Sequence, residues 1–490
     1  MFSSPPLAER HVNRLRLSAG TLVLAALAAS CTHDARRLAG PTRGPTFSSI
    51  ASSSQGSLWT DADDYVVEYA GSGAQLAAAV TAAGGHLVRI HPEIGVATVD
   101  QLTADGATRL ASAAAVRSVT RDVLMQLVPP VEQAGFQLAG DPGVADASPA
   151  TTLDPSQAIR FAQWQWNMRA IHADQAWPTG IQGQGARVAI LDTGIDDTHP
   201  ELTGCVDRTL STAFVPNQNT TGGFPAWGDD NLHGTWVASQ ICTNAFVIAS
   251  IAPQARLIAV KVLSRTGGGT FAGIIAGVVY AANVGVNVIN MSLGAYIPRN
   301  VGRLGRLNAL LAKVDNYAAS KGALVVAAAG NDGVNLDSDR ESIEIPAQSG
   351  STMGISATGP IGQTNFDQLA VYSNFGRSAV SVAAPGGGVR PDGSLASVLD
   401  LVSGACSRQT LDPRFAGCRS GIGYVFAAGT SGATPHAAGV AALVSSRFGN
   451  ALTSGQLRTR LEQSADDLGK PGVDLFYSHG RINAFRAVTQ

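Results

Sequence analysis

Residues 188–196 read VAILDTGID, and this stretch decides the fold. Its four apolar residues, followed at once by an acid and a glycine turn, predict a strand that is buried on both faces. Similar apolar runs further along the chain alternate with helical patterns. We expect strands over residues 186–191, 256–263, 286–290, 323–328 and 379–383, and helices over residues 272–282 and 304–320. This alternation predicts an α/β fold, a three-layer sandwich around a mainly parallel sheet.

The composition is that of a large folded protein. Of the 490 residues, 45% are hydrophobic and only 14% are charged, which excludes a disordered or highly charged chain. A chain of this length has room for about two to four domains. Because the formal net charge is only −2, no basic surplus indicates a nucleic-acid partner.

The N-terminus has the pattern of an export signal. Residues 1–16 carry three arginines, and residues 17–29 are almost wholly apolar but too short to span a bilayer. We therefore predict a signal peptide over residues 1–31 and a secreted or cell-surface bacterial protein. Cys31 ends a stretch that resembles a bacterial lipoprotein cleavage site, although Ala28 departs from that pattern. Lipidation of Cys31, with membrane attachment, and ordinary cleavage after an A-x-A-like site both remain open.

The remaining four cysteines predict two disulfides. Without Cys31 the chain has an even number of cysteines, which three pairings could connect. Cys406 and Cys418 close a short loop and form our first expected pair, which leaves Cys205 and Cys242 as the second. Export to an oxidising compartment favours bonded cysteines over free thiols.

Composition shifts divide the chain after the signal. Residues 32–63, rich in Ser, Thr, Gly and Pro, predict a flexible tether. Residues 64–128 show the order β-α-β-β-α-β, which is typical of a small ferredoxin-like α+β domain. Residues 129–158 contain several proline breakers and predict a linker, and residues 159–490 hold the parallel α/β pattern.

Three short motifs carry the chemistry. Asp192 follows a buried strand, His233 opens HGT, and Ser431 lies in GTSGATPH at the start of an expected helix. A serine hydroxyl needs an adjacent base to attack, and histidine has a suitable pKa for that role. A carboxylate that holds the imidazole completes the set. Each residue alone is more often a helix cap or a structural side chain, but together they predict a hydroxyl nucleophile.

From about residue 163 to residue 488, the chain resembles the subtilisin family of serine peptidases. The likeness rests on DTGID, HGT and GTSGATPH, which occur in the order Asp, His, Ser. It implies that Asp192 orients, His233 is the general base and Ser431 attacks the peptide carbonyl. The stretch AAAGN implies that Asn331 donates to the oxyanion. Gly432 departs from the family, which usually has methionine there, and implies a roomier wall beside the nucleophile.

The resemblance also implies a substrate cleft with two edges. Its substrate-binding residues would be Ser292, Leu293 and Gly294 on one edge, and Ala328 and Gly330 on the other. Glu344 falls at the floor of the pocket for the residue before the cleaved bond, where a carboxylate would favour Arg or Lys. The alternative is a Glu344 side chain turned to solvent, paired with Arg340.

Other features of the resemblance concern metals, histidines and activation. It implies no cofactor for catalysis, and structural calcium is possible. No HExxH, CxxC or EF-hand pattern occurs, so the sequence indicates no catalytic metal. The candidate oxygen ligands are Asp196, Asp197, Asp229 and Asp230, although their spacing defines no site. His199 and His436 are expected to be structural. Residues 64–128 resemble the inhibitory propeptide of the family, and we expect self-cleavage in the linker. The alternative is an unrelated binding module that the mature protein retains.

These observations predict a monomeric, secreted serine endopeptidase. It would cleave proteins or peptides through an acyl-enzyme on Ser431 and would be made as a self-processed precursor, with its propeptide as an intramolecular inhibitor. Two alternatives remain open: a catalytically silent surface protein that binds peptides, and a processing protease of narrow specificity.

Overall fold

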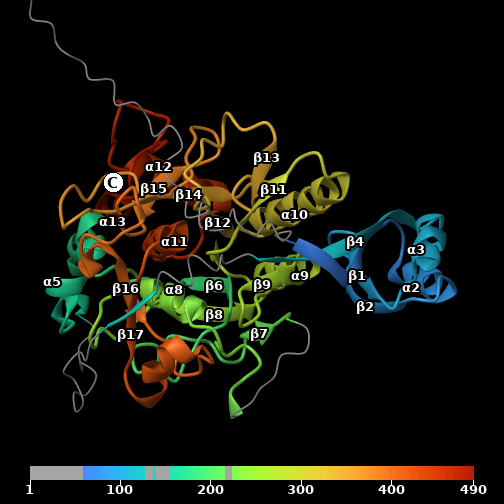
Figure 1. Cartoon of the computed structure of the whole chain (residues 1–490), viewed down its shortest axis with the longest axis horizontal. Coiled ribbons are helices and arrows are strands. Elements are labelled where there is room, and N and C mark those ends of the chain that lie inside the picture. Colours follow the sequence, from blue (N-terminus) through green and yellow to red (C-terminus); the bar gives the residue numbers. More distant parts are fainter. Residues whose placement is uncertain (1–58, 127–135, 140–153, 216–222) are drawn as a thin grey trace, which may run out of the picture. The chain divides into compact units, whose positions relative to one another are not determined.

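The computed structural model describes residues 59–126, 136–139, 154–215 and 223–490 (Figure 1). The predicted signal peptide with Cys31, most of the predicted tether and most of the predicted linker lie outside these residues. Among the helices that the structure describes, none is both long and apolar enough to cross a bilayer.

The centre of the fold is a seven-stranded sheet in which every pairing is parallel. Its strands, in spatial order, are β15 (Val382–Pro385), β14 (Met353–Thr358), β12 (Leu324–Ala328), β10 (Val288–Met291), β6 (Arg187–Asp192), β8 (Arg256–Lys261) and β7 (Thr212–Ala213). Most of these strands are buried along their whole length, as their apolar sequences predict. The predicted parallel α/β sheet is therefore confirmed, with two strands that we did not expect, β14 and the two-residue β7.

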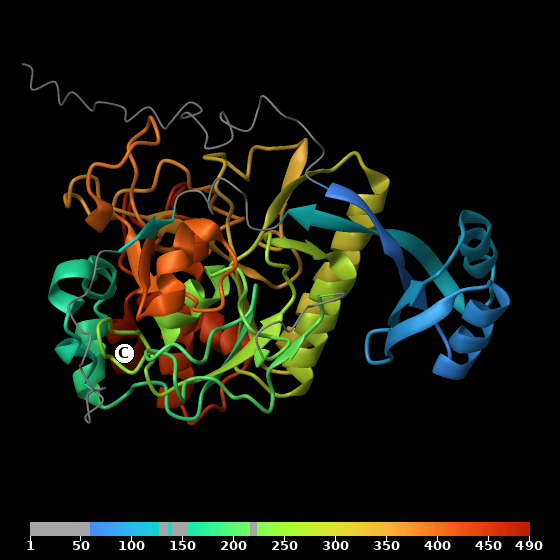
Figure 2. The same cartoon turned by 60° about the horizontal axis from the view of Figure 1, so that its bottom comes forward.

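Helices cover both faces of this sheet. In β6, Val188 and Ile190 pack into the core under α8 (His233–Ile241) and α11 (Thr430–Arg447). Ala189 and Leu191 face the opposite way, toward α9 (Phe271–Asn283) and α10 (Gly302–Ser320). Figures 1 and 2 show α8 and α11 side by side, apart from α9 and α10. The result is the expected three-layer sandwich.

Residues 59–126 supply four of the five strands of a second sheet. Its elements follow the predicted order: β1 (Trp59–Tyr69), α2 (Gly73–Ala82), β2 (His86–His91), β3 (Val96–Asp100), α3 (Ala104–Ala111) and β4 (Val116–Gln126). The spatial order β2-β3-β1-β4 is wholly antiparallel and encloses its own apolar core, which includes Val67, Leu76 and Leu110. We call residues 59–126 the N-terminal module.

The module joins the rest of the chain through its last strand. β4 pairs antiparallel with β9 (Gly268–Thr270), so that Gln126 lies opposite Gly268. Asp122 on β4 accepts hydrogen bonds from the main-chain N–H groups of Phe271 and Ala272, at 3.1 and 3.0 Å. These two residues form the first turn of α9, where N–H groups lack partners within the helix.

The remaining elements are short and surround the sheet. Two strand groups lie outside it: β11 (Ala295–Pro298) with β13 (Ser342–Ile345), and β16 (Val402–Ala405) with β17 (Tyr424–Ala427) and β5 (Gln137–Leu138). Short helices are α5 (Phe161–Trp164), α6 (Trp166–Ala170), α7 (Ala173–Ala176), α12 (Ser454–Ser464), α13 (Ala484–Thr489) and the 3₁₀ turns η1 (Pro155–Gln157), η2 (Trp177–Thr179), η4 (Val398–Asp400) and η5 (Pro413–Ser420).

Two disulfides link the described cysteines. Cys205 bonds to Cys242 at the end of α8, and Cys406 bonds to Cys418 across the loop between β16 and β17. This is the pairing that the cysteine spacing favoured. The second bond ties η5 to the end of β16, so the loop before β17 has a covalent anchor.

Candidate active site

Asp192 and His233 lie in hydrogen-bond contact. Asp192 is the last residue of β6 and His233 the first of α8, and both are fully buried. The Oδ1 atom of Asp192 lies 2.8 Å from His233 Nδ1 and also accepts from the Thr193 N–H. Since a carboxylate only accepts, Nδ1 carries the hydrogen, and Nε2 is then the basic nitrogen of a neutral imidazole.

A buried acid positions the start of α8. Asp229 accepts hydrogen bonds from the hydroxyl and the N–H of Thr235 and from the hydroxyl of Thr193. Asn231 accepts from the His233 N–H at 3.0 Å. Burial raises the pKa of Asp229 to about 6, partly offset by Lys261 and these hydrogen bonds. Thr193, which follows Asp192, is thus hydrogen-bonded to Asp229, which lies shortly before His233.

Ser431 is the second residue of α11 and is nearly buried. Its hydroxyl donates to the Ser292 main-chain oxygen at 3.2 Å. Helix α8 approaches the Ser431 turn through Trp236, which lies one turn after His233. A Cβ at Gly432, the residue after Ser431, would lie only 2.8 Å from Trp236 Cη2. The rings of Trp236 and His233 are 5.8 Å apart. The fold therefore brings the Asp192–His233 pair and the Ser431 turn into one region.

Asn331 contacts the residue before Ser431. Its Oδ1 accepts from the N–H and the hydroxyl of Thr430, at 2.8 and 2.9 Å. These contacts fix the orientation of the side-chain amide, so that Nδ2 is its donor end. The left-handed backbone conformation before it belongs to Gly330 (φ 95°).

The predicted substrate edges flank the nucleophile. Besides the contact through its carbonyl, Ser292 donates through its hydroxyl to the Ser431 main-chain oxygen at 2.8 Å, and Leu293 beside it is buried. On the other side, the Gly330 N–H donates to the Thr430 hydroxyl at 3.2 Å. Gly330 follows Ala328, the last residue of β12, and Ala329, and both alanines are buried. The chain segments of both expected edges thus touch the first turn of α11.

Glu344 lies between these two edges. A Cβ at Gly330 would come within 2.7 Å of Glu344 Oε2, and one at Gly294 would overlap Oε1. Its strand β13 pairs with β11, with Glu344 opposite Tyr296. The side chain is 1% exposed, so the alternative in which it faces solvent is wrong. Burial and the nearby Asp332 raise the pKa of the Glu344 carboxyl well above its usual range.

The other two predicted histidines have structural partners. His436 lies one turn after Ser431 on α11, with Nδ1 2.7 Å from the Gly432 oxygen and Nε2 2.8 Å from Asn167 Nδ2. Burial lowers the pKa of His436 to about 4 and that of His199 to about 4. Both rings are therefore neutral near pH 7.

The four candidate calcium ligands are engaged with protein groups instead. Asp196 accepts from Thr198, Arg408 and Gln409, and Asp229 accepts from Thr193 and Thr235. Asp197 pairs with Arg208, and Asp230 pairs with Lys261. These residues do not fit a calcium site in this arrangement. Within the described part of the chain, no group of three or more His, Cys, Asp or Glu side chains is placed to hold a metal ion.

Sequence reasoning missed a contact from the linker. Phe136 lies beside His233 and Trp236, with ring centroids 6.2 and 5.2 Å away, and β5 follows it. A single aromatic residue in a linker rich in Pro and Gly carries no pattern that could have indicated this.

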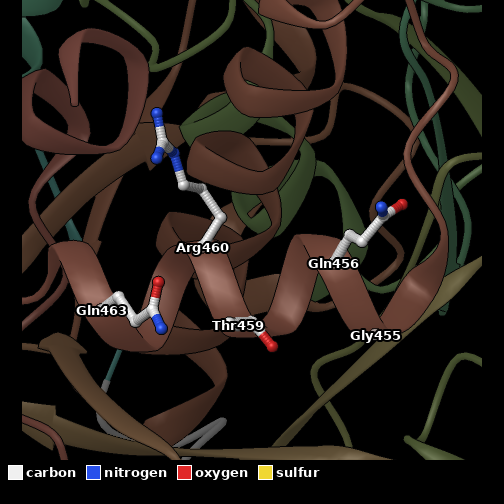
Figure 3. Close-up of a pocket in the computed structure, with 5 residues that line it drawn as sticks. All are labelled: Gly455, Gln456, Thr459, Arg460 and Gln463. Carbon is white, nitrogen blue, oxygen red and sulfur yellow. The ribbon is translucent and has the colours of Figure 1, made fainter.

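A hollow elsewhere, shown in Figure 3, is lined by Gly455, Gln456, Thr459, Arg460 and Gln463 of α12 and contains none of the predicted site residues.

Comparison with known proteins agrees with this geometry. The sequence profile of the subtilase family matches residues 183–480, which is more than half of the chain. The chain belongs to the subtilase family. It is a serine endopeptidase, a hydrolase that acts on proteins or peptides, and the family needs no cofactor for catalysis. The predicted family resemblance and enzyme class are therefore confirmed.

Individual subtilases are similar over most of this chain. A thermophilic serine proteinase of Bacillus sp. (strain AK1) is 34% identical over 67% of this chain and 68% of its own length. Thermitase of Thermoactinomyces vulgaris is 33% identical over 67% of this chain and 97% of its own. The crystal structure of the epidermin leader peptide processing serine protease of Staphylococcus aureus covers 87% of this chain and 97% of its own, with a TM-score of 0.67 and 23% identity. That likeness shows the shared fold.

Proposed function

We propose that this subtilase cleaves peptide bonds through an acyl-enzyme on Ser431. His233 takes the proton of the Ser431 hydroxyl as the oxygen attacks the substrate carbonyl, and Asp192 stabilises the imidazolium that forms. His233 gives this proton to the amine nitrogen as the peptide bond breaks, and water activated by His233 then hydrolyses the ester and frees Ser431. The Asn331 amide and the N–H of Ser431 donate to the oxyanion. The 2.8 Å contact between Asp192 and His233 is the observation that carries this proposal.

The hydroxyl of Ser431 changes its partner at the start of this reaction. It donates to the Ser292 oxygen in the structure, and it must turn toward His233 Nε2 to lose its proton. That rotation about one side-chain bond is a small step, since staggered rotamers of an unbranched hydroxyl are close in energy.

We further infer that the N-terminal module is an inhibitory propeptide and that the linker after it is cut by the enzyme itself. Four contacts support this: β4 pairs with β9, Asp122 accepts from the first turn of α9, Lys313 pairs with Glu68 at 2.8 Å, and Phe136 of the linker lies beside His233. The linker thus reaches the catalytic histidine from its own chain.

We also propose export from the cell. The predicted signal at residues 1–31 supports export, and the two disulfides fit an oxidising compartment. Whether Cys31 carries a lipid is settled by the intact mass of the mature protein, which reports the N-terminus and any acyl chains together.

One labelling experiment tests the catalytic proposal. The wild-type chain and Ser431→Ala are incubated with a fluorophosphonate probe, which reacts only with an activated serine. We expect the wild type to bind the probe and shorten by self-cleavage, and Ser431→Ala to do neither. A wild type that loses its module and still fails to bind the probe would favour a silent peptide-binding protein.

A further inference from the structure

The side chain of Phe136 is enclosed by three aromatic rings. It is only 5% exposed, although it belongs to a linker. Its ring meets His233, Trp236 and Phe415 edge to face, at centroid distances of 6.2, 5.2 and 6.4 Å. Aromatic pairs favour this geometry, so the surroundings of Phe136 form a receptor for an aromatic or large apolar side chain.

Trp236 and Phe415 are held by contacts of their own. The indole N–H of Trp236 donates to the Val402 oxygen at 3.1 Å. Phe415 lies in η5, inside the loop that the Cys406–Cys418 disulfide closes. Because these anchors do not involve Phe136, the aromatic lining is set independently of the side chain that fills it.

Gly432 makes this arrangement possible beside the nucleophile. A Cβ at this position would lie 2.8 Å from Trp236 Cη2 and 3.2 Å from Cζ2, so even alanine would press on the indole. The residue directly after Ser431 is therefore small where Trp236 approaches. This gives a physical reason for the glycine that departs from the family pattern.

The main chain after Phe136 continues along the strand that leads to Ser431. Leu138 pairs with Val425 and Gln137 with Phe426 on β17, and the Ala139 N–H donates to the Tyr424 oxygen at 2.8 Å. β17 ends at Ala427, four residues before Ser431. Such main-chain pairing binds an extended peptide whatever its sequence, while the pocket beside it selects side chains.

The direction of the chain assigns the side of the cleaved bond. The module ends on β9, where Gln126 lies opposite Gly268, and ten residues later Phe136 lies beside His233. A peptide that runs in the same direction has its N-terminal half at β9 and its C-terminal half along β17. The pocket therefore receives a residue on the C-terminal side of the cleaved bond.

We propose that the pocket formed by His233, Trp236 and Phe415 is a specificity subsite for an aromatic or large aliphatic residue on the leaving-group side of the scissile bond. In the precursor, Phe136 occupies this subsite. The proposal rests on the proposed peptidase function, and it adds the class of substrate: polypeptides with a bulky apolar residue just after the bond that is cut.

Internally quenched peptides test this subsite. Each peptide has the same N-terminal half, and its first or second residue after the cleaved bond is Phe, Leu, Ala or Asp. For the self-processed enzyme we expect kcat/KM to be at least tenfold higher with Phe or Leu than with Ala at one of these positions. Equal rates at both positions, in this enzyme and in its Phe136→Ala variant, whose own linker cannot fill the pocket, would overturn the proposal.

Variants connect the preference to the pocket. Phe415→Ala should reduce the ratio of the Phe rate to the Ala rate severalfold, and Phe415→Leu, which keeps apolar volume in the disulfide loop, should reduce it less. Phe448→Ala removes an aromatic ring that is 39% exposed at the end of α11 and should leave the ratio unchanged. An unchanged ratio in Phe415→Ala would contradict the assignment.

A binding measurement keeps the test independent of turnover. In the chain carrying Ser431→Ala and Phe136→Ala, whose linker an added protease has cut and whose module has been removed, fluorescence anisotropy reports the affinity for the Phe and Ala peptides. At least tenfold tighter binding of the Phe peptide is expected, and equal affinities would reject the subsite. If this preference appears while the wild type fails to react with the fluorophosphonate probe, the catalytic proposal fails and the subsite stands.

Discussion

The Ser292 hydroxyl donates to the main-chain oxygen of Ser431 at 2.8 Å. In a regular helix that oxygen would accept from the N–H of residue 435, but Pro435 has no N–H. Ser292 therefore supplies a hydrogen bond that the helix cannot make for Ser431. Asn290 Nδ2 in turn donates to the Ser292 hydroxyl at 3.0 Å and orients it.

Ser292→Ala should weaken both the first turn of α11 and catalysis. The buried Ser431 oxygen would lose this partner, which costs about 1–3 kcal/mol of the free energy of unfolding. A displaced nucleophile should lower kcat by roughly tenfold or more. Thermal unfolding and steady-state kinetics measure the two effects. Ser292→Thr keeps the hydroxyl and serves as the control; equal losses in both variants would contradict this role.

Asn331→Ala should lower kcat with little change in KM. Removing one oxyanion donor costs roughly 10²–10³ in rate, a magnitude established on a member of this family. An unchanged KM would show that the amide acts mainly in the transition state. Thr430→Val removes one of the contacts that orient the amide but retains the donor, so its loss should be smaller. An Asn331→Ala enzyme with normal kcat would remove Asn331 from the mechanism.

The preference for a basic residue before the cleaved bond should rise with pH. Because the raised pKa of Glu344 keeps its carboxyl neutral at low pH, the pocket attracts Arg or Lys only as this group ionises. The quantity measured is kcat/KM for an Arg peptide divided by kcat/KM for a Leu peptide. Protonation of His233 affects both peptides equally and therefore cancels in this ratio. This ratio should increase with pH in the wild type and stay flat in Glu344→Gln.

The control for this experiment is Glu341→Gln, which removes an exposed carboxylate nearby and should leave the rising ratio intact. If Arg and Lys gain nothing over Leu at any pH, the negative pocket floor has no part in specificity.

Asp315→Asn should stabilise the fold at alkaline pH. Asp315 on α10 is fully buried, and burial raises its pKa from 3.8 to about 8, against a hydrogen bond from Thr352. Between these pH values the folded chain retains a proton that the unfolded chain has lost. The free energy of unfolding contributed by this group therefore falls as pH rises from about 4 to about 8.

Melting curves of the Ser431→Ala chain, which cannot digest itself, measure this effect. Relative to its parent, the chain with Asp315→Asn should lose less thermal stability between pH 5 and pH 9. Asp392→Asn changes an exposed carboxylate and should not alter the pH dependence. Parallel losses with and without Asp315→Asn would mean that this carboxyl does not titrate as burial predicts.

Asp122→Ala should loosen the first turn of α9. The carboxylate of Asp122 accepts from two main-chain N–H groups there, and losing such partners costs about 1–3 kcal/mol. We expect hydrogen exchange in a peptide covering residues 271–273 to become about tenfold faster or more in the Ser431→Ala chain. Asp105→Ala alters an exposed acid of α3 and should leave exchange unchanged, and equal protection in both variants would exclude Asp122 as a cap.

Local sequence patterns predicted five of the seven strands of the central sheet and singled out Asp192 and His233. An apolar run that ends in an acid predicts both a buried strand and the position of Asp192 at its carboxyl end, and the structure has this arrangement. β14 escaped prediction because Met353–Thr358 consists largely of small residues, whose burial depends on neighbouring strands rather than on their own hydropathy.

Contacts between segments that are far apart in the chain determine the features that the sequence did not predict. Glu344 is buried because β13 pairs with β11, about fifty residues earlier in the chain, and nothing adjacent to Glu344 indicates that pairing. The role of Phe136 depends on rings from α8 and η5, which the linker meets only after folding. Motifs therefore predicted the candidate site, whereas the surroundings of Glu344 and Phe136 depend on long-range packing.

The pairing of β4 with β9 bears on the fate of the module after maturation. In the proposed maturation the linker is cut and the module departs, which leaves β4 as an open strand edge with unsatisfied N–H and C=O groups. A released module would then be prone to aggregation and to digestion by the peptidase. Digestion of the released module would make this activation irreversible, because a digested module cannot bind the enzyme again.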